Sequence, residues 1–506
     1  MSKKNTFYIT SPIYYATAAP HLGHMYTTII CDVVARYHRM LGHEVLFLTG
    51  TDEHGSKVYQ KAQEARKDTQ AFLDEQAAKY ELMTDVLDIS NDIFMRTSYD
   101  WHKKAAQEFW KRSFEHGDIY KKKYTGLYCV GCEAFKTEKD LDEKGLCPDH
   151  KQKPERIEEE NYFFRLSAYG AKLKKLFKEN PEFVIPEGKR KEMHALIEEG
   201  LEDVSISRHK SKLSWGVEVP GDSEQVMYVW FDALTNYITA AGYAQDEKKF
   251  KKWWPADVHV VGKEINRFHS LLWPAMLISA GVDIPKQIAV HGWITVDGQK
   301  MSKTLGNVLD PFEIVKQFPL PAVRYFMLRE IPFDSDGVFS FKRLGERYEA
   351  DLANGLGNLF YRVLSMIEKY TDGCIPQPSD DAVRTYEHVW KEYNEGFRAF
   401  RFDRALEAVW ALLRSADQVI NEEEPWKLAD PAAKQEVKLN NLLYTLATIC
   451  HHAAWFVYPF MPSISEAMFE QLGLNISEEF KHDVKKIALK PCTKIKKGSP
   501  LFPRLV

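Results

Sequence analysis

Residues 7–55 read FYITSPIYYATAAPHLGHMYTTIICDVVARYHRMLGHEVLFLTGTDEHG, and this stretch decides the fold. Its first part, 7–15, is short and rich in β-forming residues, which predicts a buried strand. Apolar residues then recur at helical spacing over 21–42, where a glycine ends the run. Over 43–55 a second apolar strand that runs into a glycine-rich loop is predicted, and a further helix is predicted over 56–80. Strands and helices that alternate in this order predict a parallel sheet with crossover helices.

The same alternation returns late in the chain. A strand is predicted over 258–264, a helix over 268–281 and a strand over 286–296. The parallel sheet is therefore expected to be interrupted by an insertion at about 117–225. From about residue 345 apolar residues recur with helical periodicity, which predicts a helical bundle. The clearest of these stretches are 356–370, 403–420 and 439–457.

The composition excludes several classes of protein. The chain has 506 residues, 44% hydrophobic and 13% aromatic, which is enough for two to four domains with large cores. Its start lacks the apolar core of a signal peptide, and no apolar run has the length of a membrane span. A net charge of −4 does not mark the whole chain as a nucleic-acid binder, and seven cysteines do not make a disulfide scaffold. A soluble, cytoplasmic protein is expected.

Two histidines bracket Leu-Gly where the first predicted strand leads into the first helix. In an open parallel sheet, ligands bind beyond the carboxyl ends of the strands, and a helix N-terminus there attracts anions. His21 and His24 would project on one side of the first turn and donate to phosphate oxygens. Gly23 would let a flat base approach the backbone. A simple strand-to-helix turn with two incidental surface histidines is the alternative.

A second phosphate signal is GQKMSKTLGN at 298–307. Lys300 and Lys303 lie three residues apart in a loop flanked by glycines. Two ammonium groups on a mobile loop can hold a polyphosphate while charge shifts during attack at the α-phosphorus. Taken alone, this stretch is better explained as a solvated basic turn.

Together, HLGH and KMSK resemble the paired signatures of class I aminoacyl-tRNA synthetases, and most of the chain resembles the methionyl-tRNA synthetases. The longest similar stretches are 10–42, 47–55, 228–238, 259–277 and 291–307. The resemblance implies an AMP-forming ligase that converts L-methionine and ATP to methionyl-adenylate and pyrophosphate. It then transfers methionine to the 3′ end of tRNA(Met), including the initiator tRNA.

The resemblance also implies which residues act on ATP and methionine. His21, His24, Lys300 and Lys303 are the expected catalytic residues. ATP, with its Mg²⁺, is expected to be bound by His21, Gly23, His24, Gly262, Glu264, Lys300, Met301, Ser302 and Lys303. Methionine is expected to be bound by Ile13, Tyr15, Asp52, Trp230, Ala233, Leu234, Tyr237, Ile265 and His269. Thr304 and Glu264 depart from the usual serine and aspartate but keep a hydroxyl and a carboxylate.

The chemistry of the methionine set agrees with this assignment. A thioether is long, unbranched and polarizable, and its sulfur packs well against aromatic rings. Asp52 matches the family carboxylate that takes the α-amino group. Without the two framing motifs, the aromatic residues would be interpreted as ordinary core.

A cluster of cysteines lies inside the predicted insertion. Cys129-x2-Cys132 is followed after fourteen residues by Cys147-x2-His150. Two such pairs predict one structural Zn²⁺ with all four ligands from protein. The alternative is a set of metal-free thiols.

The helical end carries the expected tRNA contacts. Asn358 and Arg362 lie four residues apart on one predicted helix, and Trp426 follows Pro425. RNA bases are recognised by stacking and by hydrogen bonds to their edges, and these positions match the family residues that read the anticodon. On the bare sequence, Trp426 would instead be a helix-capping core residue. Because the chain stops just after the bundle, a monomer is expected.

These expectations give an α/β fold class with a Rossmann-like catalytic domain, a zinc-binding insertion and an all-α anticodon-binding bundle. The predicted parts are a first catalytic half (1–116), the insertion (117–225), a second catalytic half with the lysine loop (226–325), a stem-contact region (326–357) and the anticodon-binding domain (358–506). Two other functions remain open. A smaller nucleotidyltransferase would leave the insertion and the helical end unexplained, and a non-catalytic tRNA-binding paralogue would not need the intact histidines and lysines.

Overall fold

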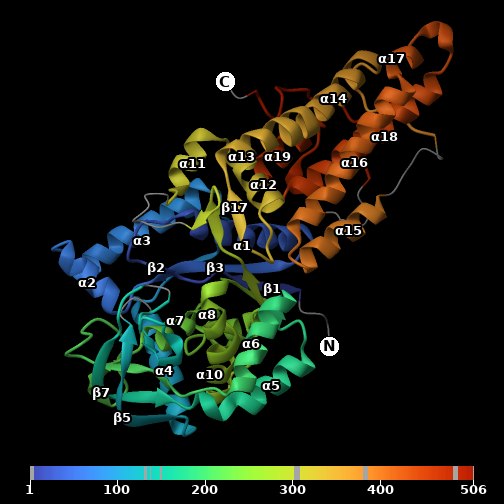
Figure 1. Cartoon of the computed structure of the whole chain (residues 1–506). Helices are drawn as coiled ribbons and strands as arrows, with labels where there is room; N and C mark the ends of the chain where they lie inside the picture. Colours follow the sequence, from blue (N-terminus) through green and yellow to red (C-terminus); the bar gives the residue numbers. More distant parts are fainter. Residues whose placement is uncertain are drawn as a thin grey trace. The chain divides into compact units, whose positions relative to one another are not determined.

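The parallel sheet predicted around residues 7–55 is present in the computed structural model of the chain (Figure 1). The structure describes residues 5–129, 134–136, 138–148, 151–300, 308–379, 386–481 and 488–504. The sheet has the strand order β2-β3-β1-β13-β14-β8, with β4 paired to β3. Its strands are β1 (Thr6–Thr10), β2 (Tyr14–Tyr15), β3 (Glu44–Asp52), β4 (Ile93–Arg96), β8 (Val184–Ile185), β13 (Val258–Gly262) and β14 (Ile288–His291).

The direction of the strands confirms the α/β fold class. The pairs β2–β3, β3–β4, β1–β13 and β8–β14 are all parallel. All five residues of β13 are buried, as is every residue of β3 after the first. Strands buried on both faces have continuous apolar sequences, which is why these stretches do not alternate.

The prediction of a single strand over 7–15 is wrong. The structure has β1 and β2 as separate strands, and the sheet order puts them on opposite sides of β3. Pro12 lies between them and has no N–H to donate to a ladder. The break has a consequence for function, because it places Tyr15 in register with Asp52 at the end of β3.

Two further predicted elements are also divided. The helix expected over 56–80 is α2 (Ser56–Glu64) and α3 (Thr69–Val86), separated by Arg66 with φ of 54° and by the N-cap Asp68. The strand expected over 286–296 is β14 and β15 (Ile294–Val296), which belong to different sheets. Gly292 lies between them, where a Cβ atom would be only 2.1 Å from the carbonyl oxygen of Ser335.

The chain divides into two compact units. Unit 1 comprises Met1–Asn5, His21–Val45 and His291–Val506, and unit 2 comprises Thr6–Pro20 and Leu46–Val290. The parallel sheet contributes most of its strands to unit 2.

In unit 2, antiparallel sheets follow α4 (Asp100–Glu115) and interrupt the parallel alternation. One has the order β6-β5-β7-β9 and the other β10-β12-β11. The strands are β5 (Ile119–Cys129), β6 (Ala134–Lys136), β7 (Glu155–Phe164), β9 (Val204–Ser205), β10 (Ser207–His209), β11 (Glu218–Val219) and β12 (Asp222–Met227). The remaining helices are α5 (Gly170–Glu179), α6 (Glu187–Glu199), α7 (Val229–Leu234), α8 (Asn236–Ala240), α9 (Glu247–Trp253) and α10 (Trp273–Ser279).

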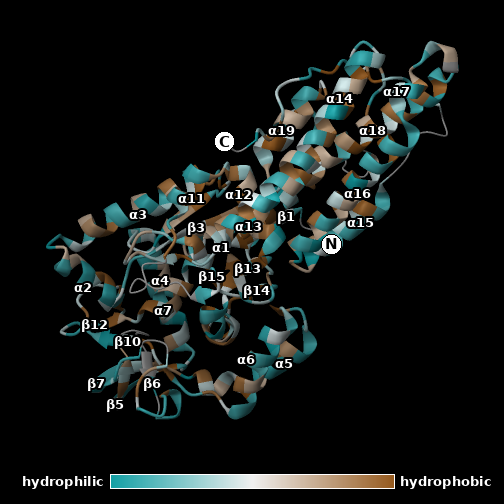
Figure 2. Cartoon of the chain, turned by 45° about the horizontal axis from the view of Figure 1, so that its top comes forward, coloured by the Kyte–Doolittle hydropathy of each residue, from teal (hydrophilic) through white to brown (hydrophobic). Residues whose placement is uncertain are grey.

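Aromatic side chains from these helices fill the core of unit 2. Phe109 and Trp110 of α4 lie between α7 and α10: the Trp110 ring is 5.0 Å from Phe231, and the Phe109 ring is 5.8 Å from Trp273. All four residues are almost fully buried. Figure 2 shows the corresponding pattern in hydropathy, with β13 and β14 mostly brown and α2 and α6 mostly teal.

Unit 1 is mainly helical, which confirms the helical region predicted beyond residue 345. Helix α1 (Leu22–Met40) belongs to it: Tyr37 stacks on Phe397 at 4.0 Å, and its hydroxyl donates to Asn394. The other helices are α11 (Pro311–Gln317), α12 (Leu320–Glu330), α13 (Phe341–Arg347), α14 (Asn358–Tyr370), α15 (Glu387–Arg398), α16 (Phe402–Glu423), α17 (Pro425–Leu428), α18 (Glu436–Val457), α19 (Pro462–Gln471) and α20 (Ile476–Glu479). A small sheet orders β16 (Gln299–Lys300), β15 and β17 (Gly337–Phe339).

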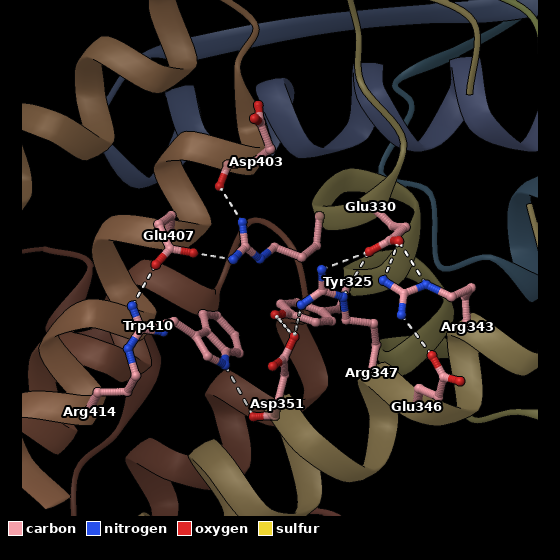
Figure 3. A network of polar contacts seen from close by, with 11 residues as sticks. Tyr325, Glu330, Arg343, Glu346, Arg347, Asp351, Asp403, Glu407, Trp410 and Arg414 are labelled. Carbon is pink, nitrogen blue, oxygen red and sulfur yellow. Dashed lines mark hydrogen bonds and ion pairs between the residues drawn. The ribbon is translucent and has the colours of Figure 1, made fainter. Parts of the chain in front are cut away.

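Helices α13 and α14 are joined by a π-helical stretch, Tyr348–Gly357. The indole N–H of Trp410 on α16 donates to the carbonyl of Asp351 inside this stretch, at 3.1 Å. The Asp351 carboxylate accepts from Tyr325 at 2.8 Å and from Arg347 at 3.0 Å (Figure 3). The π stretch is thereby bonded to α12, α13 and α16 within one polar network.

No helix in the described ranges is long and apolar enough to reach across a bilayer.

Candidate active site

Helix α1 begins at the histidine pair that the sequence singled out. His21 is the N-cap: its Nδ1 accepts the N–H of Gly23 at 3.1 Å, and its own N–H donates to Nδ1 of His24 at 3.1 Å. The two imidazole rings stack with centroids 3.8 Å apart. A Cβ atom on Gly23 would lie 3.0 Å from the His21 ring, so glycine permits this close approach. The reciprocal bonds form a capping box in which histidines replace the usual residues.

The capping bonds also determine where the protons of these rings lie. Burial, reinforced by the neighbouring His21, lowers the pKa of His24 well below its usual value, so this ring is neutral. Because Nδ1 accepts a backbone N–H in both rings, a neutral imidazole at either position carries its proton on Nε2. Each histidine therefore presents an Nε2–H donor at the N-terminus of a helix, which is the chemistry an anion requires.

A residue just after the lysine loop is bonded to the histidine motif. The N–H of Leu22, the first residue of α1, donates to the carbonyl of Leu309 at 3.0 Å, just after the loop. The start of the loop is held by pairing of Lys300 with Thr295 in β15. Within unit 1, Lys300 at the start of the loop is thus paired with β15, and Leu309, two residues past the loop, is bonded to the first residue of α1. Met301, Ser302 and Lys303 lie outside the described residues.

The end of β14 is bonded to α1 as well. His291 Nε2 lies 2.8 Å from the hydroxyl of Thr27, which is itself bonded to the carbonyl of Gly23 at 3.1 Å. The ring of Tyr26 contacts His291 edge to face at 5.2 Å. Within unit 1, these contacts fix the first turn of α1 beside His291.

In unit 2, several residues of the predicted methionine set lie together. The Tyr237 hydroxyl is 2.7 Å from Nε2 of His269, and Trp230 contacts His269 edge to face at 6.5 Å. Trp230 stacks on Phe268 at 3.9 Å, nearly parallel. Phe268 and His269 lie in a π-helical turn, a geometry often found at functional sites. Phe268 is not among the site residues predicted from the sequence.

The remaining members of the set are buried or partly buried in unit 2. Ala233 and Leu234 are buried on α7, between Trp230 and Tyr237 in the sequence. Ile13 and Ile265 are partly buried against the same apolar core. At the carboxyl edge of the sheet, Asp52 is 7% exposed and pairs in register with Tyr15. An almost buried carboxylate at this edge suits an ammonium group.

The two histidines beside Tyr237, His259 and His269, are neutral. His269 Nδ1 bonds the carbonyl of Ile265 at 3.0 Å, so Nδ1 is the donor and Nε2 accepts from Tyr237. Burial lowers the pKa of His269 to about 4. The next ring, His259, stacks on Tyr237 at 4.2 Å, and burial likewise holds its pKa well below the usual range. Neutral histidines at this position suit an apolar thioether substrate better than they suit a substrate with an ionised side chain.

Gly262 and Glu264 lie where β13 ends. Gly262 is the last residue of the strand, and Glu264 lies in the short 3₁₀ turn Lys263–Ile265. A Cβ atom on Gly262 would be 2.6 Å from a carboxylate oxygen of Glu264, so the glycine lets this carboxylate fold against the strand end. The Glu264 carboxylate beside Gly262, which has no side chain, is suited to accept hydrogen bonds from hydroxyl groups such as those of a ribose.

Only half of the predicted zinc ligands can be placed. Cys129 ends β5 and Cys147 precedes β7; both are buried and neither is disulfide-bonded. Cys132 and His150 lie outside the described residues. Within the ranges described, no three metal-binding side chains form a cluster. Two buried thiols without a disulfide fit a structural Zn²⁺, and the site stays a prediction.

The predicted anticodon residues lie in unit 1. Asn358 is exposed at the start of α14, and Arg362 one turn later forms an ion pair with Asp417 at 3.0 Å. Pro425 is buried as the first residue of α17, whereas Trp426 is 49% exposed. The interpretation of Trp426 as a core residue is therefore wrong. An exposed indole on a helical bundle is available for stacking.

Sequence reasoning missed a buried group of ionisable residues beside Asp52. Glu53 accepts from Arg96 at 2.6 Å and from Thr51 at 2.7 Å, and it is fully buried. The next residue, His54, is bonded to Asp232. Three consecutive ionisable residues at the end of an apolar strand are a signal that could have drawn attention to this group.

Comparison with known proteins agrees with this geometry. The model of the family described as "tRNA synthetases class I (M)" matches residues 7–156 and 149–364. The methionine–tRNA ligase of Caldanaerobacter subterraneus is 45% identical over 99% of this chain and 79% of that enzyme. That of Thermotoga maritima is 44% identical over 99% of this chain and 80% of that enzyme.

A solved structure shares both fold and sequence. Mycobacterium tuberculosis methionyl-tRNA synthetase in complex with methionyl-adenylate superposes with a TM-score of 0.94 at 38% identity, covering 99% of this chain and all of that one. The resemblance inferred from the sequence is confirmed: the chain belongs to the methionine–tRNA ligase family of the class I aminoacyl-tRNA synthetases.

Proposed function

We propose that the chain carries out the two steps of its family through the residues described above. It activates L-methionine with ATP and then esterifies methionine to the 3′ end of tRNA(Met), including the initiator tRNA, for protein biosynthesis. The observation that supports this most directly is in unit 1. The histidine motif begins α1, and its Leu22 N–H is bonded to the carbonyl of Leu309, two residues past the lysine loop.

In the first step, the methionine carboxylate attacks the α-phosphorus of Mg²⁺-bound ATP. A carboxyl–phosphate bond forms, the bond to the β-phosphate breaks, and pyrophosphate leaves. His21 and His24 donate from Nε2 to phosphate oxygens, and Lys300 and Lys303 balance the charge that moves toward pyrophosphate. Positioning and charge stabilisation are sufficient for such chemistry, so no protein nucleophile is needed.

Methionine is selected in unit 2. Asp52 holds its ammonium group, while Trp230, Tyr237 and His269 enclose the thioether. Because His269 is neutral and its Nε2 is occupied by the Tyr237 hydroxyl, no donor or charge of this pair is left for a polar side chain. A buried pocket without spare donors excludes polar amino acids by leaving their groups unpaired.

In the second step, a terminal ribose hydroxyl of tRNA attacks the activated carbonyl and AMP leaves. The exposed Trp426 stacks an anticodon base, and Asn358 and Arg362 read base edges from α14. To bind a base, Arg362 must then either give up its ion pair with Asp417 or contact Asp417 and the base at the same time. The exposure of Trp426 supports this role.

The proposal includes one structural Zn²⁺ held by Cys129, Cys132, Cys147 and His150. With four protein ligands it would stabilise the insertion and take no part in catalysis. A monomeric state and a cytoplasmic location complete the proposal.

The test is ATP–pyrophosphate exchange measured with each of the twenty amino acids in turn. Exchange should depend on methionine alone. Exchange with another amino acid would keep the reaction class and contradict the pocket, and a lack of exchange with every amino acid would favour the non-catalytic paralogue.

A further inference from the structure

Asp232 lies at the centre of a buried cluster that no step of the mechanism uses. Its Oδ2 is 2.5 Å from Nδ1 of His54, and its Oδ1 is 2.7 Å from Nε2 of His102. Asp232 and His102 are fully buried and His54 is 2% exposed. The three residues come from α7, the loop after β3 and α4, all within unit 2.

The cluster is not explained by stability alone. Burial would raise the pKa of Asp232, but the two imidazoles outweigh it and keep this carboxyl ionised. A buried charge is costly even when paired, and an apolar replacement often stabilises a fold as much. In addition, Nδ1 of His102 is buried and has no hydrogen-bond partner among the described residues. Proteins keep such costly arrangements mainly at functional sites.

The position of the cluster indicates what it does. Asp232 lies on α7 between Trp230 and Ala233, so its backbone is continuous with one wall of the methionine pocket. His54 follows Asp52 by two residues, and its N–H lies 3.5 Å from a carboxylate oxygen of Asp52. The His54–Asp232 bond therefore connects the element that binds the ammonium group to the helix that lines the side-chain pocket.

The neighbour of His54 is fixed separately. Glu53 is bonded to Arg96 and Thr51, and its carbonyl accepts from the indole of Trp215 at 2.7 Å. With Glu53 and His54 both bonded, the strand end that carries Asp52 has little freedom to shift. A short side-chain bond, from His54 to Asp232, reaches from this strand end to α7.

We infer that Asp232 is a positioning residue that sets the distance between the ammonium site and the thioether pocket. Methionine is bound at both ends, so the distance between the two elements that bind it determines which side-chain length fits. The residue thus contributes to selection for length, not to the chemical step. The inference rests on the proposed function, in which Asp52 and α7 hold the two ends of methionine.

The experiment compares methionine with ethionine, whose side chain is longer by one methylene, in ATP–pyrophosphate exchange. One methylene is typically worth about 10- to 200-fold in kcat/KM. Asp232→Asn should raise KM for methionine about tenfold, leave KM for ATP unchanged, and lower the methionine-to-ethionine ratio of kcat/KM about tenfold. The ratio should fall because a loosened α7 admits the longer side chain.

Asp118 offers a matched control. It is another buried carboxylate of unit 2, bonded to His116 at 2.6 Å and to Ser279 at 2.8 Å, and the mechanism does not use it. Asp118→Asn should lower stability without changing the ratio. An equal fall of the ratio in Asp118→Asn would overturn the inference, because the effect would then be general softening.

A second pair of variants decides the matter if Asp232→Asn does not fold. His54→Ala removes the bond and should lower the ratio, whereas His54→Asn places an amide donor near the Nδ1 position and should restore it. A ratio that stays at the wild-type value in His54→Ala overturns the inference. Absence of methionine-dependent exchange in the wild-type protein would instead contradict the proposed function itself.

Discussion

At the scale of single residues, His269 shows how burial decides chemistry. Its Nδ1 donates to a backbone carbonyl, so its Nε2 can accept from Tyr237 only while the ring is neutral. Burial lowers its pKa to about 4, so the ring stays neutral at physiological pH. Protonation would turn the acceptor into a donor and break the bond to Tyr237. The pocket is thus tied to the proton occupancy of one buried side chain.

This shift predicts a pH dependence of stability. Between pH 6.5 and 4 the unfolded chain binds a proton at His269 that the folded pocket excludes, so the free energy of unfolding decreases as the pH falls. Urea denaturation at pH 7 and pH 5 should show that wild type loses about 2 kcal/mol more than His269→Gln, which cannot titrate. Other buried histidines contribute equally to both proteins. Equal pH dependence in the two proteins would contradict the assignment.

Some site residues could be predicted from the sequence because their signal is local. His21 and His24 lie three residues apart where a strand leads into a helix, and spacing alone indicates them. The Asp232–His54 bond joins residues 178 apart in the chain, so no local pattern reveals it. The exposure of Trp426 is likewise set by how α17 lies in the fold, and residue type alone favours a buried tryptophan.

At the scale of elements, the π-helical stretch Tyr348–Gly357 changes the course of a long helix just before Asn358. A π-helix has more residues per turn than an α-helix, so it turns the following residues to a different side of the axis. The side of α14 that Asn358 and Arg362 occupy therefore depends on this stretch. Periodicity over ten residues does not distinguish the two helix types, so the π-helical stretch could not be predicted from the sequence.

The bond from Trp410 to the Asp351 carbonyl is expected to stabilise the π stretch. Trp410→Phe should lower the free energy of unfolding by about 1 kcal/mol more than a matched tryptophan-to-phenylalanine change. Trp455 provides the match, since it is fully buried and its indole N–H has no partner among the described residues. Urea denaturation of both variants isolates the hydrogen bond from the loss of ring area. Equal losses would mean that this bond contributes nothing.

The zinc knuckle is predicted at the same scale. Elemental analysis of the purified protein should find one zinc atom per chain, because Cys129, Cys132, Cys147 and His150 supply one tetrahedral ligand set. Removal of the metal with a chelator should make the thiols of Cys129, Cys132 and Cys147 reactive and lower the thermal stability of the protein. Cys450, a buried cysteine outside the insertion, should stay unreactive in the folded protein. A content near zero or near two would refute the assignment.

At the scale of the whole chain, the fold class could be predicted because alternating strands and helices are a repeated signal. The boundaries within it could not be predicted as reliably. Pro12 divides what the apolar pattern presents as one strand, and Gly292 divides another between two sheets. In both places a single backbone requirement outweighed a run of favourable side chains. The same breaks bring Tyr15 to Asp52 and end β14 beside Thr27, so the deviations from the pattern build the site.

Methionine activation and tRNA charging are expected to depend on different parts of the chain. A substitution at the exposed Trp426 should affect one reaction without the other. Trp426→Ala should lower kcat/KM for tRNA charging by about 5- to 150-fold, since stacking of one base is worth about 1–3 kcal/mol. Methionine-dependent exchange should stay near wild type, because the adenylate forms without the anticodon. Phe114→Ala removes an aromatic of equal exposure, 50% against 49%, from unit 2 and should change neither reaction. If Trp426→Ala reduced exchange and charging equally, the residue would support the fold of the chain instead of binding tRNA, and the anticodon assignment would have to be abandoned.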